Sequence, residues 1–148
     1  MDVKIKLIAM IVSMLVMLNL MCGCYGKNGN LRGSSSPANY IDLHAKESYD
    51  LIKENEGNKD FIILDVRTPK EYDSGHLANA INMDFNSSDF KEMLATLDKD
   101  KPYLVHCRSG GRSSNALKIM REMKFNKVYH MLGGILGWIK AGYPTVKN

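Results

Sequence analysis

The segment that most constrains the fold of this chain is residues 101–114, where a short apolar strand, a glycine-rich turn and an amphipathic helix follow one another. Its sequence is KPYLVHCRSGGRSS, and Cys107 stands where the strand meets the turn. A strand, loop and helix start in this order direct backbone N–H groups and the positive end of a helix dipole at one point. We therefore predict an anion-stabilising loop centred on Cys107.

Cys107 has the sequence surroundings of a reactive thiol. Arg108 and Arg112 are near it, and an inert cysteine would have apolar neighbours instead. A helix N-terminus and nearby arginines lower the pKa of a thiol and increase its thiolate fraction at neutral pH. Cys107 is thus the candidate nucleophile. The candidate substrate-binding residues of the loop are Arg108, Ser109, Gly110, Gly111, Arg112 and Ser113.

Apolar strand patterns alternate with helical patterns along the rest of the chain. Strands are predicted over residues 40–43, 61–66, 80–85, 103–106 and 127–131. Helices are predicted over residues 45–55, 90–97, 113–124 and 135–141. Near-continuous apolar strands that alternate with helices indicate an α/β fold, with a mainly parallel five-stranded sheet and helices on both faces. Ligands of such sheets bind beyond the carboxyl ends of the strands, where Cys107 lies.

Three further segments carry recognisable motifs. Residues 63–72 read ILDVRTPKEY and residues 75–83 read GHLANAINM, while residues 128–134 read VYHMLGG. Together with the loop around Cys107, they resemble the rhodanese family of sulfurtransferases over nearly all of residues 40–146. One departure is Asn79, where the family usually has glycine. Asparagine tolerates a positive φ better than most residues, so we expect the turn to be kept.

The resemblance implies a rhodanese-like fold and a sulfur-transfer activity. In such an enzyme the cysteine takes sulfane sulfur from thiosulfate or a similar anionic donor and passes it, as a persulfide, to a thiol or to cyanide. Four residues separate Cys107 from Arg112. The related cysteine phosphatases use five, and the smaller ring of amides suits a single sulfur atom better than a phosphate. The resemblance thus favours a thiosulfate sulfurtransferase.

Two other classes of function stay open. A cysteine phosphatase or arsenate reductase would use the same thiolate and arginine, although the loop spacing disfavours it. A non-catalytic module would hold a persulfide or bind a partner without turnover, although such modules usually lack the cysteine that is present here.

Several other polar residues lie in the matched motifs. Asp65 and Arg67 resemble an acid and base pair near the family's active site; we expect the pair to tie the sheet to its loops, and Arg67 is also a candidate for binding the anionic substrate. His106 should point away from its neighbour Cys107, because adjacent strand residues face opposite sides. His76 is expected to order a loop. No metal-ligand spacing and no nucleotide-binding lysine motif is found, so no cofactor is predicted.

The first residues have the pattern of an export signal. An uncharged run over residues 7–21 follows two lysines, and Gly23 precedes Cys24 as in a lipoprotein cleavage site. We predict a signal peptide over residues 1–23, lipidation of Cys24, a flexible tether over residues 24–38 and a rhodanese-like domain over residues 39–148. An uncleaved anchor and an ordinary secretory signal are the alternatives. The domain is then expected in the cell envelope, in the periplasm or on the outer surface, held by lipid to a membrane.

The net charge and the cysteine content limit which classes of binding partner and which disulfide pairings we expect. The net charge of +4 is modest and scattered, which gives no basic stripe for nucleic acid but is compatible with an anionic lipid surface. Cys107 is the one cysteine within residues 39–148, so it has no partner there for an internal disulfide.

Overall fold

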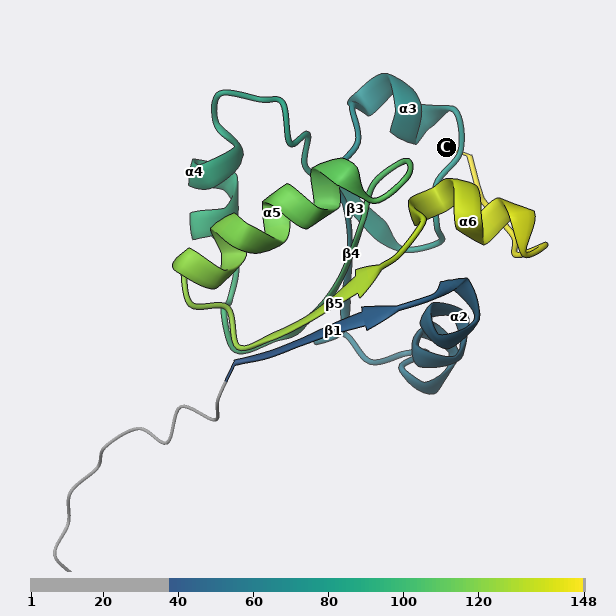
Figure 1. The fold of residues 1–148 in the computed structure, drawn as a ribbon, viewed down its shortest axis with the longest axis horizontal. Coiled ribbons are helices and arrows are strands. Elements are labelled where there is room, and N and C mark those ends of the chain that lie inside the picture. Colours follow the sequence, from purple (N-terminus) through teal and green to yellow (C-terminus); the bar gives the residue numbers. More distant parts are fainter. Residues whose placement is uncertain (1–37, 148) are drawn as a thin grey trace, which may run out of the picture. The chain divides into compact units, whose positions relative to one another are not determined.

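The computed structural model describes residues 38–147, which form a parallel sheet with helices on both faces (Figure 1). The predicted signal peptide, Cys24 and nearly all of the predicted tether lie outside the described residues. Among residues 38–147, none of the helices is long and apolar enough to cross a membrane.

Five strands make up the sheet, in the spatial order β1-β5-β4-β2-β3. Every adjacent pair runs parallel, which confirms the predicted fold class. Because the strands are parallel, their carboxyl ends meet at one edge of the sheet. The bounds are β1 (Asn39–Leu43), β2 (Ile62–Asp65), β3 (Ala80–Asn82), β4 (Pro102–His106) and β5 (Lys127–Met131).

The helices are divided between the two faces of the sheet. Helices α4 and α5 lie to one side of the strands, and α2 and α6 lie to the other (Figure 1). The bounds are α2 (Ala45–Glu54), α3 (Pro69–Asp73), α4 (Phe90–Ala95), α5 (Gly111–Glu122) and α6 (Gly134–Lys140).

Strand β3 ends at Asn82 and helix α4 at Ala95, three and two residues before the predicted ends at residues 85 and 97. Two other helices differ from the prediction. Helix α3 was missed; a capping box between Thr68 and Glu71 starts it, and it has only five residues. Helix α5 begins at Gly111, two residues before the predicted start at residue 113, because Gly110 takes a positive φ of 108° and turns the chain into the helix at once.

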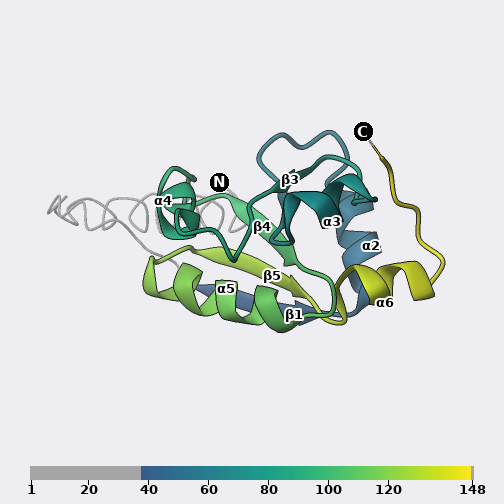
Figure 2. The same cartoon turned by 90° about the horizontal axis from the view of Figure 1, so that it is seen from above.

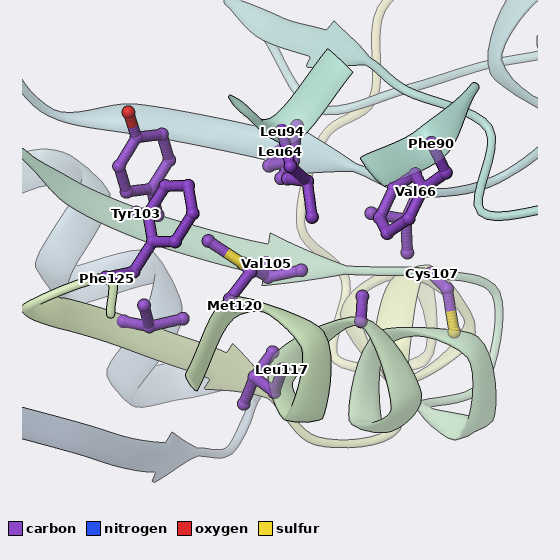
Figure 3. Packing of buried hydrophobic residues seen from close by; sticks show 12 residues of the cluster. Leu64, Val66, Phe90, Leu94, Tyr103, Val105, Cys107, Leu117, Met120 and Phe125 are labelled. Atoms are coloured by element: carbon purple, nitrogen blue, oxygen red, sulfur yellow. The ribbon is translucent and has the colours of Figure 1, made fainter. Parts of the chain in front are cut away.

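Each face of the sheet has its own hydrophobic core. Figure 3 shows the core under α4 and α5, where side chains such as Leu64, Leu94 and Met120 are fully buried. Trp138 and Leu104 belong to the core on the opposite face. The Cys107 sulfur lies at the end of the first core, beside the first turn of α5 (Figure 3). The packed sheet thus fixes the position of the thiol.

Turns and the last segment complete the domain. Asn79 has a φ of 61°, so the turn that the sequence predicts at this position is kept. After α6 the chain turns back along the domain (Figure 2). Val146 pairs with His76 through two backbone hydrogen bonds of 2.9 and 2.8 Å. This bridge ties the last residues to the loop between α3 and β3.

Candidate active site

The Cys107 sulfur receives hydrogen bonds from the loop that follows it. Cys107 comes directly after β4, and its side chain is buried, with 1% of the residue exposed. The backbone N–H of Gly110 donates to Sγ over 3.1 Å, and the hydroxyl of Ser113 lies 3.4 Å from Sγ. Donors directed at one sulfur stabilise the charge of a thiolate or a persulfide.

The pKa of the Cys107 thiol is lowered by these hydrogen bonds. Burial by itself raises the pKa, because it disfavours the charged form. The Ser113 hydroxyl and the backbone N–H groups of Ser113, Gly110 and Ser109 act against burial, and the net pKa falls below the usual value of a cysteine. The direction agrees with the sequence-based expectation. Hydrogen bonds are the largest causes that lower the pKa, and the charge of Arg112 also interacts favourably with the thiolate.

Arg112 joins the loop to α3. Its guanidinium makes a bidentate ion pair with the Glu71 carboxylate, with N···O distances of 2.6 and 2.7 Å. Glu71 also accepts hydrogen bonds from the backbone and hydroxyl of Thr68. Arg112 therefore orients the loop through its partner. Sequence reasoning gave Glu71 no role, because the two residues lie 41 positions apart along the chain.

The start of α6 lies against the backbone of the loop. The N–H of Ile135 donates to the Cys107 carbonyl over 2.9 Å, and the N–H of Leu136 donates to the Arg108 carbonyl over 3.0 Å. A Cβ atom on Gly134 would lie 2.6 Å from the carbonyl carbon and oxygen of Arg108, so only glycine allows this approach. The helix thus fixes the outer side of the loop.

The remaining loop residues form the rim around the sulfur. Arg108, Ser109 and Gly111 are exposed. Among residues 38–147, Arg108 has no ion-pair partner and no side-chain hydrogen bond. Its charge is therefore available to an anion that approaches Cys107.

The structure does not bring Arg67 to this rim. Arg67 is 4% exposed, and its guanidinium binds both oxygens of Asp65 as well as the carbonyls of Glu71 and Gly75. These bonds occupy its donors with groups of the chain itself. The geometry fits the expectation that Asp65 and Arg67 tie the sheet end to its loops, and it leaves Arg67 out of the substrate site.

His76 and His106, the two histidines discussed from the sequence, do not contact the Cys107 sulfur. His106 is fully buried, and burial lowers its pKa, because it disfavours the charged form of the imidazole. His76 stacks on Tyr72 with ring centroids 3.8 Å apart, and its Nδ1 lies 3.1 Å from the Tyr72 carbonyl, as a loop-ordering residue would. Within the described part of the chain, no three acidic, histidine or cysteine side chains are grouped to hold a metal ion.

One histidine near the sulfur was missed. The Nε2 atom of His130 lies 2.9 Å from the Ser113 hydroxyl, and its Nδ1 lies 3.1 Å from a carboxylate oxygen of Asp42. Sequence reasoning noted His130 only as part of the last strand. The available signal was that Val128 and His130 alternate onto one face of β5, the face covered by α5.

Comparisons with known proteins agree with this site. Residues 45–141 match the family described as the rhodanese-like domain. The thiosulfate sulfurtransferase GlpE of Coxiella burnetii is 33% identical over 106 residues, which are 72% of this chain and 92% of that protein. A putative sulfurtransferase of Bacillus subtilis, YtwF, is 36% identical over 63% of this chain and 85% of its own length.

Solved structures give the same result. A rhodanese-related protein from Thermoplasma volcanium is 35% identical, with a TM-score of 0.62 over 74% of this chain and 100% of its own. A polysulfide-sulfur transferase from Wolinella succinogenes is 31% identical, with a TM-score of 0.59 over 74% of this chain and 80% of its own. The chain therefore belongs to the rhodanese-like family of sulfurtransferases.

Proposed function

We propose that this rhodanese-like sulfurtransferase takes sulfane sulfur from thiosulfate, or from a similar anionic donor, and passes it to a thiophilic acceptor through a persulfide on Cys107. The observation that carries the proposal is the set of hydrogen bonds at the sulfur. The Gly110 N–H donates to Sγ, the Ser113 hydroxyl lies within hydrogen-bond distance of it, and the pKa of the thiol is lowered. A thiolate is the form of cysteine that attacks sulfur.

The reaction is a double displacement. The Cys107 thiolate attacks the outer sulfur of thiosulfate, a new S–S bond forms, and the old S–S bond breaks as sulfite leaves with its electron pair. The terminal sulfur of the persulfide carries the negative charge, and the N–H groups of the loop stabilise it. A thiol in the cell, or cyanide in an assay, then attacks the terminal sulfur and restores the thiolate, with thiocyanate as the product from cyanide.

Arg108 is the residue that we propose for recognition of the donor anion. It is exposed on the rim and has no ionic partner among the described residues. We expect Arg108→Ala to raise the KM for thiosulfate by roughly tenfold, since a charge-assisted hydrogen bond contributes about 1.5 kcal/mol. The kcat should change little. Lys118→Ala removes an exposed cation from the side of α5 and should leave the KM as it is; an unchanged KM in Arg108→Ala would remove this role.

The first test is the intact mass of the reduced protein before and after thiosulfate. Cys107→Ser is the control, because it removes the nucleophile and keeps the other two cysteines. We expect a gain of one sulfur atom in the native protein, none in the control, and loss of the added sulfur as thiocyanate when cyanide is added. A fully reduced thiol that gains no sulfur from thiosulfate would contradict the proposal for this donor, and turnover of an aryl phosphate would favour a phosphatase.

We also propose that the domain is exported and held at a membrane by lipid on Cys24. The apolar run over residues 7–21 and the Gly23-Cys24 pair support this. Metabolic labelling with a fatty acid should label the native protein and the Cys22→Ser variant but not Cys24→Ser. Label that persists in Cys24→Ser would exclude this site of lipidation.

A further inference from the structure

A chain of four polar groups runs from the buried sulfur to the edge of the sheet. The Ser113 hydroxyl lies 3.4 Å from the Cys107 sulfur and 2.9 Å from Nε2 of His130. Nδ1 of the same imidazole lies 3.1 Å from the carboxylate of Asp42. Asp42 and His130 are direct register partners on the parallel strands β1 and β5, so the sheet itself holds the carboxylate against the imidazole.

The burial of these groups differs along the chain. Ser113 is fully buried and His130 is 6% exposed, whereas 65% of the Asp42 side chain is exposed. The titratable groups that face His130 are Asp42 from β1 and, across Ser113, Cys107 at the end of β4. Its register partner on β4 is the apolar Val105. The imidazole is thus a buried group with one carboxylate partner, and the sulfur-transfer steps do not use it.

The single hydroxyl proton of Ser113 has three possible acceptors. These are the Cys107 sulfur, the Gly110 carbonyl at 3.0 Å, and Nε2 of His130 whenever that nitrogen carries no proton. A protonated Nε2 instead donates to the Ser113 oxygen, and the hydroxyl proton is then free for the sulfur. A proton on Nε2 therefore removes one of the acceptors that compete with the sulfur for the Ser113 hydroxyl, and the Gly110 carbonyl is the competitor that remains.

We propose that Ser113, His130 and Asp42 form a relay that takes the proton of the Cys107 thiol. The thiol proton passes to the Ser113 oxygen while the hydroxyl proton passes to Nε2, so the products are a thiolate, an intact hydroxyl and an imidazolium. No proton is gained or lost in total, and the Asp42 carboxylate balances the imidazolium charge. Ser113 contacts the reacting atom, and His130 and Asp42 are positioning residues that act through it. The inference rests on Cys107 being the nucleophile of the proposed function.

The test measures the thiolate without any sulfur donor. Iodoacetamide alkylates thiolates, and mass spectrometry of the Cys107 peptide follows its rate in the full chain over a range of pH. In His130→Gln the amide can still donate to Ser113 but cannot take a proton. We expect this variant to react about tenfold more slowly near pH 6, because its thiol has lost a proton acceptor, and at the native rate near pH 10, where the thiol ionises without the relay. Asp42→Asn should show the same change to a smaller extent, about threefold, because it keeps an acceptor without charge.

Two controls separate a relay from a structural role. His44→Gln makes the same change at an exposed histidine just after β1 and should keep the native profile. In a Ser113→Ala background, His130→Gln should have no further effect, since the connection to the sulfur is already broken. A folded His130→Gln with the native pH profile, or an effect that persists in the Ser113→Ala background, would overturn the relay. If His130→Gln does not fold, the test depends on Asp42→Asn, which changes an exposed side chain. A native pH profile of alkylation in Asp42→Asn would then overturn the relay.

Because sulfur loading by thiosulfate is measured separately, the two proposals fail in different ways. If the native protein gains no sulfur from thiosulfate but the variants show the altered alkylation profiles, the relay is supported and thiosulfate is excluded as the donor. If the native protein gains sulfur but the variants show the native profile, thiosulfate is supported as the donor and the relay is excluded.

Discussion

At the scale of single residues, Glu71 connects two parts of the active site. It closes the capping box of α3 with Thr68 and forms the bidentate ion pair with Arg112 of the loop. The Arg112 guanidinium, together with the hydrogen bonds from Thr68, lowers the pKa of the Glu71 carboxyl to about 2, although partial burial acts in the other direction. The folded protein thus holds Glu71 ionised at pH values where the unfolded chain protonates it.

We expect Glu71→Gln to remove a pH-dependent part of the stability. Because the folded pKa lies below the unfolded one, the contribution is complete above about pH 4.5 and is lost as the pH falls toward about 2. At pH 7 the variant should be less stable by roughly 1 to 2 kcal/mol, after allowance for solvent screening. Urea unfolding of both proteins over this range should show a difference that shrinks toward acid pH.

The matched control for Glu71 is Glu54→Gln, on the exposed side of α2. It should cost little stability at any pH, because Glu54 has no ion pair among the described residues. A difference between native protein and Glu71→Gln that stays constant from neutral to acid pH would contradict the ionic account.

At the scale of elements, the contact between α6 and the loop depends on the absence of a side chain at Gly134. Its φ of 55° and its closeness to the Arg108 carbonyl allow α6 to donate two backbone hydrogen bonds to the loop. Any Cβ would push the helix and the loop apart. The shape of the ring around Cys107 is therefore set partly by a helix more than 20 residues later in the chain.

We expect Gly134→Ala to destabilise the domain by about 2 to 4 kcal/mol, since it combines backbone strain with a steric clash. Sulfur transfer should fall further than the loss of folded protein explains, because the loop carbonyls move. Thermal unfolding and the rate of persulfide formation measure the two effects. Gly142→Ala is the control: its φ is 83° but no atom lies within 4 Å of the added Cβ, so only strain of about 1 kcal/mol remains. Equal losses in both variants would show that the contact with the loop does not matter.

The helices and strands also show how much of the fold could be predicted from the sequence. Apolar runs placed all five strands, and β5 was predicted at its observed bounds, because a strand buried on both faces has a strong signal. Helix α3 has no apolar face of its own long enough to detect and depends on a capping box. Cys107 and its loop were predicted because they are contiguous. The partners Glu71 and His130 were not, since only the strand order and the docking of α3 bring them to the loop.

At the scale of the whole molecule, two cores hold the sheet from opposite faces, and Cys107 belongs to the core under α4 and α5. Leu94 of α4 is fully buried in that core, whereas 47% of Leu136 on α6 is exposed. The position of Cys107 therefore depends on the same core packing that stabilises the fold.

We expect Leu94→Ala to lower the free energy of unfolding by about 2 to 5 kcal/mol, through lost burial and a residual cavity. The same change at Leu136 should cost less than about 1 kcal/mol, because its side chain is half in water and its backbone hydrogen bond to the loop is kept. Urea unfolding measures both. A similar cost at the two leucines would mean that the core under α4 contributes less than its burial indicates.

The depth of the Cys107 side chain would expose the thiolate and the proposed persulfide to solvent to different extents. Only 1% of the residue is exposed, so bulky oxidants reach the bare thiolate poorly. In the persulfide that we propose, the added sulfur would be bonded about 2 Å from Sγ and would stand nearer the rim, because a donor can reach Cys107 only from the solvent side. Further oxidation of a bare thiol ends in acids that are not reduced again, whereas a terminal sulfur can be given away and replaced. In the reaction that we propose, the resting protein thus keeps its nucleophile buried, whereas the persulfide form would hold its transferable sulfur nearer to the solvent.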